Sequence, residues 1–178
     1  MRLAIEKPML MGDDEGTKHE FKILAEKDKN TSIYLTNYKG NVTYSTKSGD
    51  VRKNFDSLFH QNDIVNLVFS GLKEIKQSQL MVKIKHKDYF IKTITIKNEP
   101  TCYHCHGSTQ PVLGEMIVMQ DVSDTMSEIR KQLYEIIAIS VVGFFLLITV
   151  LWFFIRNIVI SPITKITNAL KEIAHGDG

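Results

Sequence analysis

An uncharged apolar run constrains this chain more than any other feature of its sequence. Residues 136–155 read IIAISVVGFFLLITVLWFFI, which is 20 residues without a charged side chain. As an α-helix this run is about 30 Å long, the thickness of the apolar core of a bilayer. Trp152 lies near one end of it, where interfacial aromatic residues gather. The run predicts a transmembrane helix over 136–155, and the alternative is a buried helix of a soluble domain.

The charges of the chain say little about its function, and those on either side of the run leave the orientation of the predicted transmembrane helix open. The 178 residues carry a formal net charge of +2, and 24% are charged, mostly within 1–135. The lysines of 83–97 alternate with apolar residues, which is typical of a half-solvated sheet and gives no reason to expect nucleic acid. Two basic residues precede the run and three follow it, so the positive-inside rule does not decide which end is cytoplasmic.

The residues before the run predict an α+β domain over 1–121. Apolar spacing predicts helices over 3–27 and 63–72, the second capped by Asn62 or Asp63. Alternating apolar residues predict strands, with turn residues at 37–41 and 86–88. The strands are expected at 32–36, 42–46, 79–85, 90–97 and 112–118. Five strands with helical cover favour an antiparallel sheet.

Two heptad-like seams flank the apolar run. Their apolar residues are spaced by three and four, which is typical of a coiled coil. The first seam lies in a predicted juxtamembrane helix over 122–135 and the second within 156–178. They consist of Val122, Met126, Ile129, Leu133 and Ile136, and of Ile163, Ile166, Leu170 and Ile173. Seams on both sides of a membrane predict a parallel homodimer that conducts motion along its axis.

Both cysteines of the chain lie in one short motif, Cys102-Tyr103-His104-Cys105-His106. Cys-x-x-Cys-His is the attachment signature of c-type haem. Two thiols three positions apart can reach both vinyl groups on one edge of the macrocycle, and the following histidine can then bind the iron. The motif therefore predicts covalent haem on Cys102 and Cys105, with His106 as an axial ligand.

Three other interpretations of the motif stay open. A structural zinc site would crowd four ligands into five residues, whereas zinc sites usually combine two separated pairs. A redox-active disulfide would be expected at a helix start in a βαβ unit, which the strand-rich surroundings do not favour. A chance match is the third. His104 is expected to point away from the iron.

The ligand on the other side of the iron is not fixed by the motif. Met9 is the first candidate and His60 the second, because a thioether or an imidazole can bind haem iron. The remaining candidates are Met11, His19, Met81 and His86. Water or a small gas could equally occupy this position. Single acids such as Glu99 and Glu115 are expected to be solvated rather than catalytic.

The segment around the motif resembles the periplasmic c-type haem sensor domains of bacterial transducers. The residues that carry the resemblance are NEPTCYHCHG at 98–107 and PVLG at 111–114. Such domains occur in methyl-accepting chemotaxis proteins, sensor histidine kinases and diguanylate cyclases. The resemblance covers about residues 5–135 and implies a PAS-like or Cache-like fold that holds one haem c.

The C-terminal tail resembles the first helix of a HAMP linker. The resemblance rests on ISPI at 160–163 and IAHGD at 173–177, and residues 156–178 would hold half of such a unit. It implies a cytoplasmic C-terminus and a periplasmic haem domain, anchored in a bacterial inner membrane. Members of this family normally begin with another transmembrane helix, so we expect an upstream segment to be missing or its start misassigned.

These features predict a haem-based redox or gas sensor module of a membrane signal transducer. No nucleophile constellation, phosphate loop or paired-carboxylate pattern is visible, so no enzyme activity is expected in this chain. A membrane-anchored c-type cytochrome for electron transfer is the alternative, although it would need neither seam nor HAMP-like tail. A Cache-type sensor of a small ligand is a third possibility, which would leave Cys102 and Cys105 unexplained.

Overall fold

The computed structural model describes residues 2–160, 162–163, 166, 168 and 176. They belong to two compact units, Met1–Met126 and Ser127–Gly178. The first unit contains a five-stranded sheet in the order β2-β1-β5-β4-β3, and every neighbouring pair is antiparallel. The strands are β1 Thr31–Asn37, β2 Val42–Ser45, β3 Gln77–Ile84, β4 Lys87–Lys97 and β5 Val112–Asp121.

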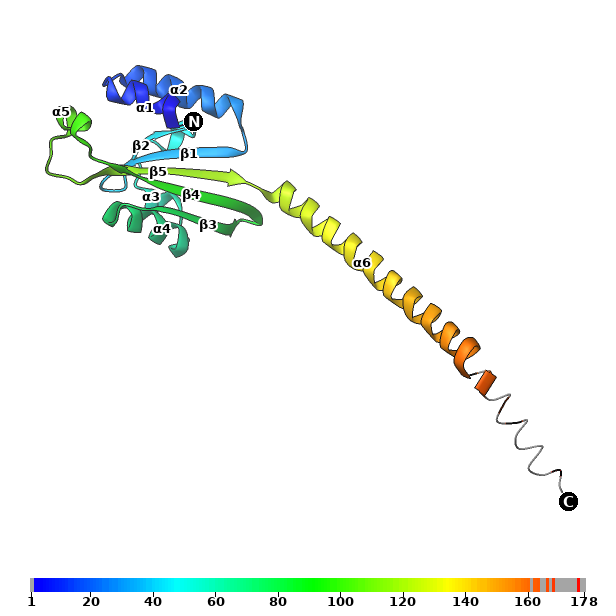
Figure 1. Cartoon of the computed structure of the whole chain (residues 1–178). Coiled ribbons are helices and arrows are strands. Elements are labelled where there is room, and N and C mark those ends of the chain that lie inside the picture. The colour runs from blue at the N-terminus through cyan, green and yellow to red at the C-terminus, as the bar shows by residue number, and fades with distance from the viewer. Residues whose placement is uncertain (1, 161, 164–165, 167, 169–175, 177–178) are drawn as a thin grey trace. The chain divides into compact units, whose positions relative to one another are not determined.

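Helices cover both faces of this sheet, as Figure 1 shows. α1 (Arg2–Leu10) and α2 (Asp14–Lys27) lie on one face, and α3 (Phe55–Leu58) and α4 (Asn62–Lys73) on the other. A short helix, α5 (Tyr103–His106), follows a 3₁₀ turn (Pro100–Cys102) between β4 and β5. A second 3₁₀ turn, Ser48–Asp50, follows β2. The predicted α+β class, with an antiparallel sheet and an N-terminal helix, is confirmed.

Two hydrophobic cores result, one on each face. Strand alternation separates them, because successive side chains point to opposite faces. Tyr34 packs with α3 and α4, where its ring meets Phe55 edge to face at a centroid distance of 5.7 Å. Its neighbours Ile33 and Leu35 pack with the residues of α1 and α2. The sheet is therefore buried on both sides in its central strands.

The single helix predicted over 3–27 is wrong, because the chain turns between α1 and α2. Gly12 has a φ of 67°, which a glycine adopts without steric cost. Asp13 then caps α2, its Oδ1 accepting a hydrogen bond of 2.8 Å from the backbone N–H of Gly16. Residues 12–20 contain no apolar side chain, so the apolar pattern is interrupted at the turn, and Pro8 and Gly12 are further signals of the break.

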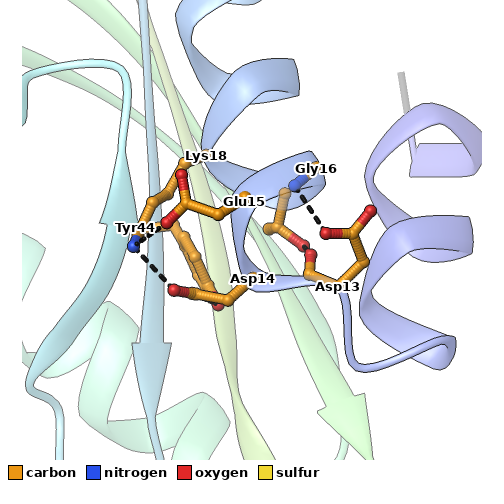
Figure 2. Close-up of polar contacts among 7 residues, drawn as sticks. Asp13, Asp14, Glu15, Gly16, Lys18 and Tyr44 are labelled. Carbon is orange, nitrogen blue, oxygen red and sulfur yellow. Dashed lines mark hydrogen bonds and ion pairs between the residues drawn. The ribbon is translucent and has the colours of Figure 1, made fainter.

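Figure 2 shows how the start of α2 is attached to β2. The hydroxyl of Tyr44 donates to the Asp14 carboxylate at 2.6 Å, and Lys18 lies 2.6 Å from the same carboxylate. Both contacts hold the pKa of Asp14 below its usual range, Lys18 more than Tyr44. The Tyr44 ring also stacks on Phe21 at 5.7 Å. These contacts fix the α1–α2 hairpin on the sheet.

Other element ends also differ from the prediction. The β3–β4 hairpin turns at Lys85 and His86, whose positive φ values of 47° and 71° suit a two-residue turn, rather than over 86–88. β4 consequently starts at Lys87 instead of residue 90, β3 runs from Gln77 to Ile84 instead of 79–85, and β5 extends past 118 to Asp121. The cap residue of α4 is Gln61, without a side-chain capping hydrogen bond, instead of Asn62 or Asp63.

A group of polar contacts fastens the end of β5, and we call Lys87, Asp88, Asp121 and Ser123 the exit clasp. The Asp121 carboxylate accepts from Lys87 Nζ at 2.6 Å and from the Ser123 hydroxyl at 2.6 Å. Asp88 N–H donates to the Ser123 hydroxyl at 2.9 Å. Lys87 and Ser123 lower the pKa of Asp121 to about 2. The start of β4 thus holds the first residues of the next helix.

The second unit consists mainly of a long apolar helix. α6 spans Ser123–Phe154 and continues as a π-helix over Ile155–Ile160. Its most apolar window has a mean hydropathy of 2.7, which makes α6 long and apolar enough to cross a membrane. The first predicted seam falls on α6, where Ile129, Leu133 and Ile136 are exposed. The second seam depends on Leu170 and Ile173, which lie outside the described residues.

Gly114 provides a direct test of the β1–β5 packing. A Cβ atom at this position would overlap the backbone carbonyl oxygen of Thr36, whereas a Cβ at Gly49 would meet nothing within 4 Å. We expect Gly114→Ala to destabilise the domain by about 2 kcal/mol and Gly49→Ala by less than about 0.5 kcal/mol. Thermal unfolding of the full chain in detergent should show a loss of roughly 4 to 8 °C for the first variant. Equal midpoints for the two variants would contradict the register.

Candidate functional site

The haem-type motif lies at one end of the sheet, where β4 ends and β5 begins (Figure 1). The 3₁₀ turn and α5 place Cys102, Cys105 and His106 at positions i, i+3 and i+4, which share one side of a helical turn. All three side chains line the same cavity, and both cysteines are free thiols. His104 is exposed and does not line the cavity.

The cavity has a volume of about 490 Å³ and lies between α1, the sheet and the motif. One wall is apolar and comes from α1, β1, β4 and β5. Its members are Ile5, Leu10, Leu35, Ile94, Ile96, Leu113 and Met116. Met9 and Ile75 also line the cavity, and the polar lining residues include Lys76, Lys97 and Glu99. The cavity therefore combines an apolar floor with a charged margin.

Met9 lines this cavity together with the motif. It lies on α1 and is half-buried, so the chain brings a thioether to the cavity from a segment more than 90 residues away in the sequence. His60 is exposed just beyond α3, on the other face of the sheet, and does not line the cavity. The remaining candidates are exposed and absent from its walls: Met11, His19, Met81 and His86.

Asn98 holds the motif loop closed, a role that the sequence did not reveal. Its side-chain amide donates to the carbonyl oxygens of Gly107 at 2.7 Å and Gln110 at 2.8 Å, and its backbone N–H donates to Pro111 at 3.0 Å. Gly107 ends α5 with a φ of 68°. An asparagine directly after a strand and before a Cys-x-x-Cys-His motif is the pattern that could have suggested this role.

Protein side chains alone do not assemble a metal centre in the part of the chain that the structure describes. No group of three or more His, Cys, Asp and Glu side chains there lies close enough together to hold a metal ion. The four residues weighed for zinc, Cys102, His104, Cys105 and His106, thus do not converge on one point. Haem needs fewer protein ligands than a bare metal ion, because the macrocycle supplies four nitrogen ligands itself and leaves two axial positions.

A buried acid stands behind the cavity wall. Glu115 was expected to be solvated, which is wrong: its side chain is completely buried on β5. Burial raises its pKa to about 7, while Thr93 and Lys76 act in the opposite direction. Glu99 is exposed, as expected. The signal that could have identified Glu115 is its position inside the apolar run VLGEMIVM, which has no other charged residue.

No protein-family model matches the chain. Solved structures similar to it include a domain of an HTR-like protein from Haloarcula marismortui, at a TM-score of 0.40 and 10% identity, covering 52% of this chain and 98% of that one. The V. cholerae histidine kinase DctB sensor domain is similar at a TM-score of 0.42 and 13% identity, covering 67% of this chain and 42% of that one. The ligand-binding domain of Mlp24 with asparagine is similar at a TM-score of 0.37 and 8% identity, covering 63% of this chain and 38% of that one. The chain spans less than half of the last two, and at these scores the likenesses carry no argument about function.

The Asn98 contacts predict that this side chain keeps the motif rigid. Asn98→Ala removes two hydrogen bonds, which should favour local opening by about 2 kcal/mol. Because amide exchange follows local opening, the Gly107 amide should then exchange about thirty-fold faster in the haem-free chain. Asn66→Ala, at an exposed position on α4, is the matched control. An unchanged exchange rate at Gly107 would show that the loop is held by other contacts.

Proposed function

We propose that this chain holds one covalent haem c through Cys102 and Cys105, with His106 as an axial iron ligand. The observation that carries the proposal is that these three side chains, and a methionine from α1, line one cavity. The spacing of the thiols matches the two vinyl groups of the macrocycle, and the histidine that follows belongs to the same helical turn. When bound, the haem would supply a one-electron couple and an iron that can bind small gases.

The residues of the cavity fit such a group. A volume of about 490 Å³ falls within the range of cofactor pockets. The apolar floor suits the flat face of a porphyrin. Lys76 and Lys97 are cationic groups on the same walls and suit its acidic propionates. The side chains required are thus present at one place without a contribution from outside the first unit.

Two of the other interpretations of the motif fit less well. A thioredoxin-type disulfide belongs at the helix start of a βαβ unit with parallel strands. Here α5 connects β4 and β5, which are antiparallel neighbours. A zinc site would need convergent ligands, whereas His104 is not among the residues that line the cavity with Cys102 and Cys105.

The haem domain would act as a redox or gas sensor for a membrane transducer. β5 starts five residues after Gly107, lines the cavity through Leu113 and Met116, and ends in the exit clasp at the start of α6. A change of ligand or charge in the cavity therefore acts on the strand that continues into the apolar helix. Such a signal requires two arrangements that differ in ligand affinity.

The proposed setting follows from the same features. α6 would span a bacterial inner membrane with the haem domain in the periplasm, and the seam of Ile129, Leu133 and Ile136 would pair with a second copy. Output would come from a cytoplasmic kinase, cyclase or chemotaxis domain beyond these residues, and no catalysis is assigned to this chain. The alternative, an anchored electron-carrier cytochrome, would not require the exit clasp or the seam.

Covalent attachment predicts a simple loss-of-haem experiment. The chain is co-expressed with the c-type maturation machinery and stained for haem after denaturing electrophoresis. Wild-type chain and the His104→Ala control should keep the stain, because His104 lies outside the cavity. The Cys102→Ala, Cys105→Ala variant should lose it completely. A folded, exported wild-type chain without stain would remove the haem proposal and leave a small-ligand sensor.

The place of Met9 in the cavity predicts which ligand occupies the second axial position of the iron. If its thioether binds the iron, Met9→Ala should convert a six-coordinate spectrum to one with an open site, lower the reduction potential and allow rapid carbon monoxide binding. His60→Ala should leave spectrum and potential unchanged, because His60 is remote from the cavity. A wild-type iron that already binds carbon monoxide would favour gas sensing and remove Met9 as a ligand.

A further inference from the structure

Glu115 is a buried carboxyl group for which the proposed function has no use. Its side chain is fully buried, and neither carboxylate oxygen has a hydrogen-bond partner among the described residues. α4 approaches it with Gly71, where a Cβ atom would overlap the carboxylate. Isolated buried carboxylates are costly, and an apolar side chain would avoid that cost. An acid at this position, under a glycine that makes room for it, therefore points to a role of its own.

The surroundings of Glu115 contain little that could stabilise a negative charge. Threonines face it from the two neighbouring strands and Gly71 from α4. These are Thr36 on β1 and Thr93 and Thr95 on β4. The Thr93 hydroxyl is buried and has no partner among the described residues either. The charged group whose field reaches Glu115 is Lys76, after α4, so one cation and the Thr93 hydroxyl oppose the cost of ionising Glu115.

Glu115 shares a wall with the cavity. Thr95, which pairs with it across β4 and β5, lines the cavity and donates to the carbonyl oxygens of Gly71 at 3.0 Å and Lys76 at 2.9 Å. Lys76 lines the cavity as well, and so does Met116, the next residue in the chain. In such a buried setting a charge is screened far less than in water. A change of charge in the cavity is therefore felt at Glu115.

We propose that Glu115 is a redox-linked proton site, which rests on the haem function proposed above. With haem bound in the cavity, the Glu115 carboxylate would take one proton from solvent and form an O–H bond when an external one-electron donor reduces the group. When an external one-electron acceptor takes that electron, the O–H bond of Glu115 would break and the proton would return to solvent. Electron and proton thus balance, and the ionised acid forms beneath α4 in the oxidised state alone.

The acid is poised for this exchange. Burial raises the pKa of Glu115 to about 7, so at neutral pH a modest change in cavity charge alters its protonation. Because Gly71 places α4 directly against the carboxylate, ionisation would weaken the packing of α4 on β5. Protonation of Glu115 would then couple the redox state of the haem to the packing of α4 on the second face of the sheet.

The test measures the haem midpoint potential of the full chain between pH 5 and 9. In the wild type the potential should fall with rising pH, by up to about 59 mV for each tenfold change in proton activity. Glu115→Gln should abolish this slope near neutrality and keep the covalent haem. Glu26→Gln, exposed on α2, should keep the slope. A flat wild-type profile, or the same slope in Glu115→Gln, would overturn the proton site and leave the haem function intact.

Two further readouts cover other outcomes. If Glu115→Gln does not fold, the reduced-minus-oxidised infrared spectrum of the wild type should gain a protonated-carboxyl band that shifts in D₂O, and its absence overturns the proposal. In the haem-free Cys102→Ala, Cys105→Ala chain, stability should fall as pH rises between 4.5 and about 7, since the folded state holds the proton more tightly. A folded wild-type chain without haem refutes both the function and this inference.

Discussion

The long antiparallel pairing of β4 with β5 is the contact on which the rest of the molecule depends. Each strand is central in the sheet, and the pairs run from Lys97–Val112 at one end to Tyr89–Asp121 at the other. The first end carries the motif loop, which Asn98 closes. The second end carries the exit clasp. A strand of 10 residues spans about 30 Å, so one ladder connects the cavity to the first residues of α6.

Strand alternation lets β5 serve two environments at once. Met116 faces the cavity and the core under α1 and α2, whereas Glu115 and Ile117 face the core under α3 and α4. The two acids of the strand are perturbed in opposite directions: burial raises the pKa of Glu115, while Lys87 and Ser123 lower that of Asp121. The buried acid would respond to charge in the cavity, whereas Asp121, which is half-buried, stays ionised and keeps its hydrogen bonds to Lys87 and Ser123.

Hydrophobic periodicity and the Cys-x-x-Cys-His motif predicted much of this structure, and the predictions that were wrong have physical causes. Alternation located all five strands, helical spacing located α4, and the length of an uncharged apolar run located the apolar helix. The break at Gly12 was missed because the apolar residues on its two sides were joined into one helix, although residues 12–20 between them carry no apolar side chain. The cavity could not be deduced at all, since it depends on α1 folding back over β4, more than 80 residues later in the sequence. Met9 was named because of its chemistry, and tertiary packing is what sets it apart from His60.

The most direct test of the central claim is the intact mass of the full chain, produced with the c-type maturation machinery, followed by sequencing of the peptide that contains Cys102 and Cys105. The account predicts the mass of one haem added to the chain, with both modified cysteines in that single peptide. An unmodified mass with two reactive thiols, in a chain that is folded and exported, would contradict it.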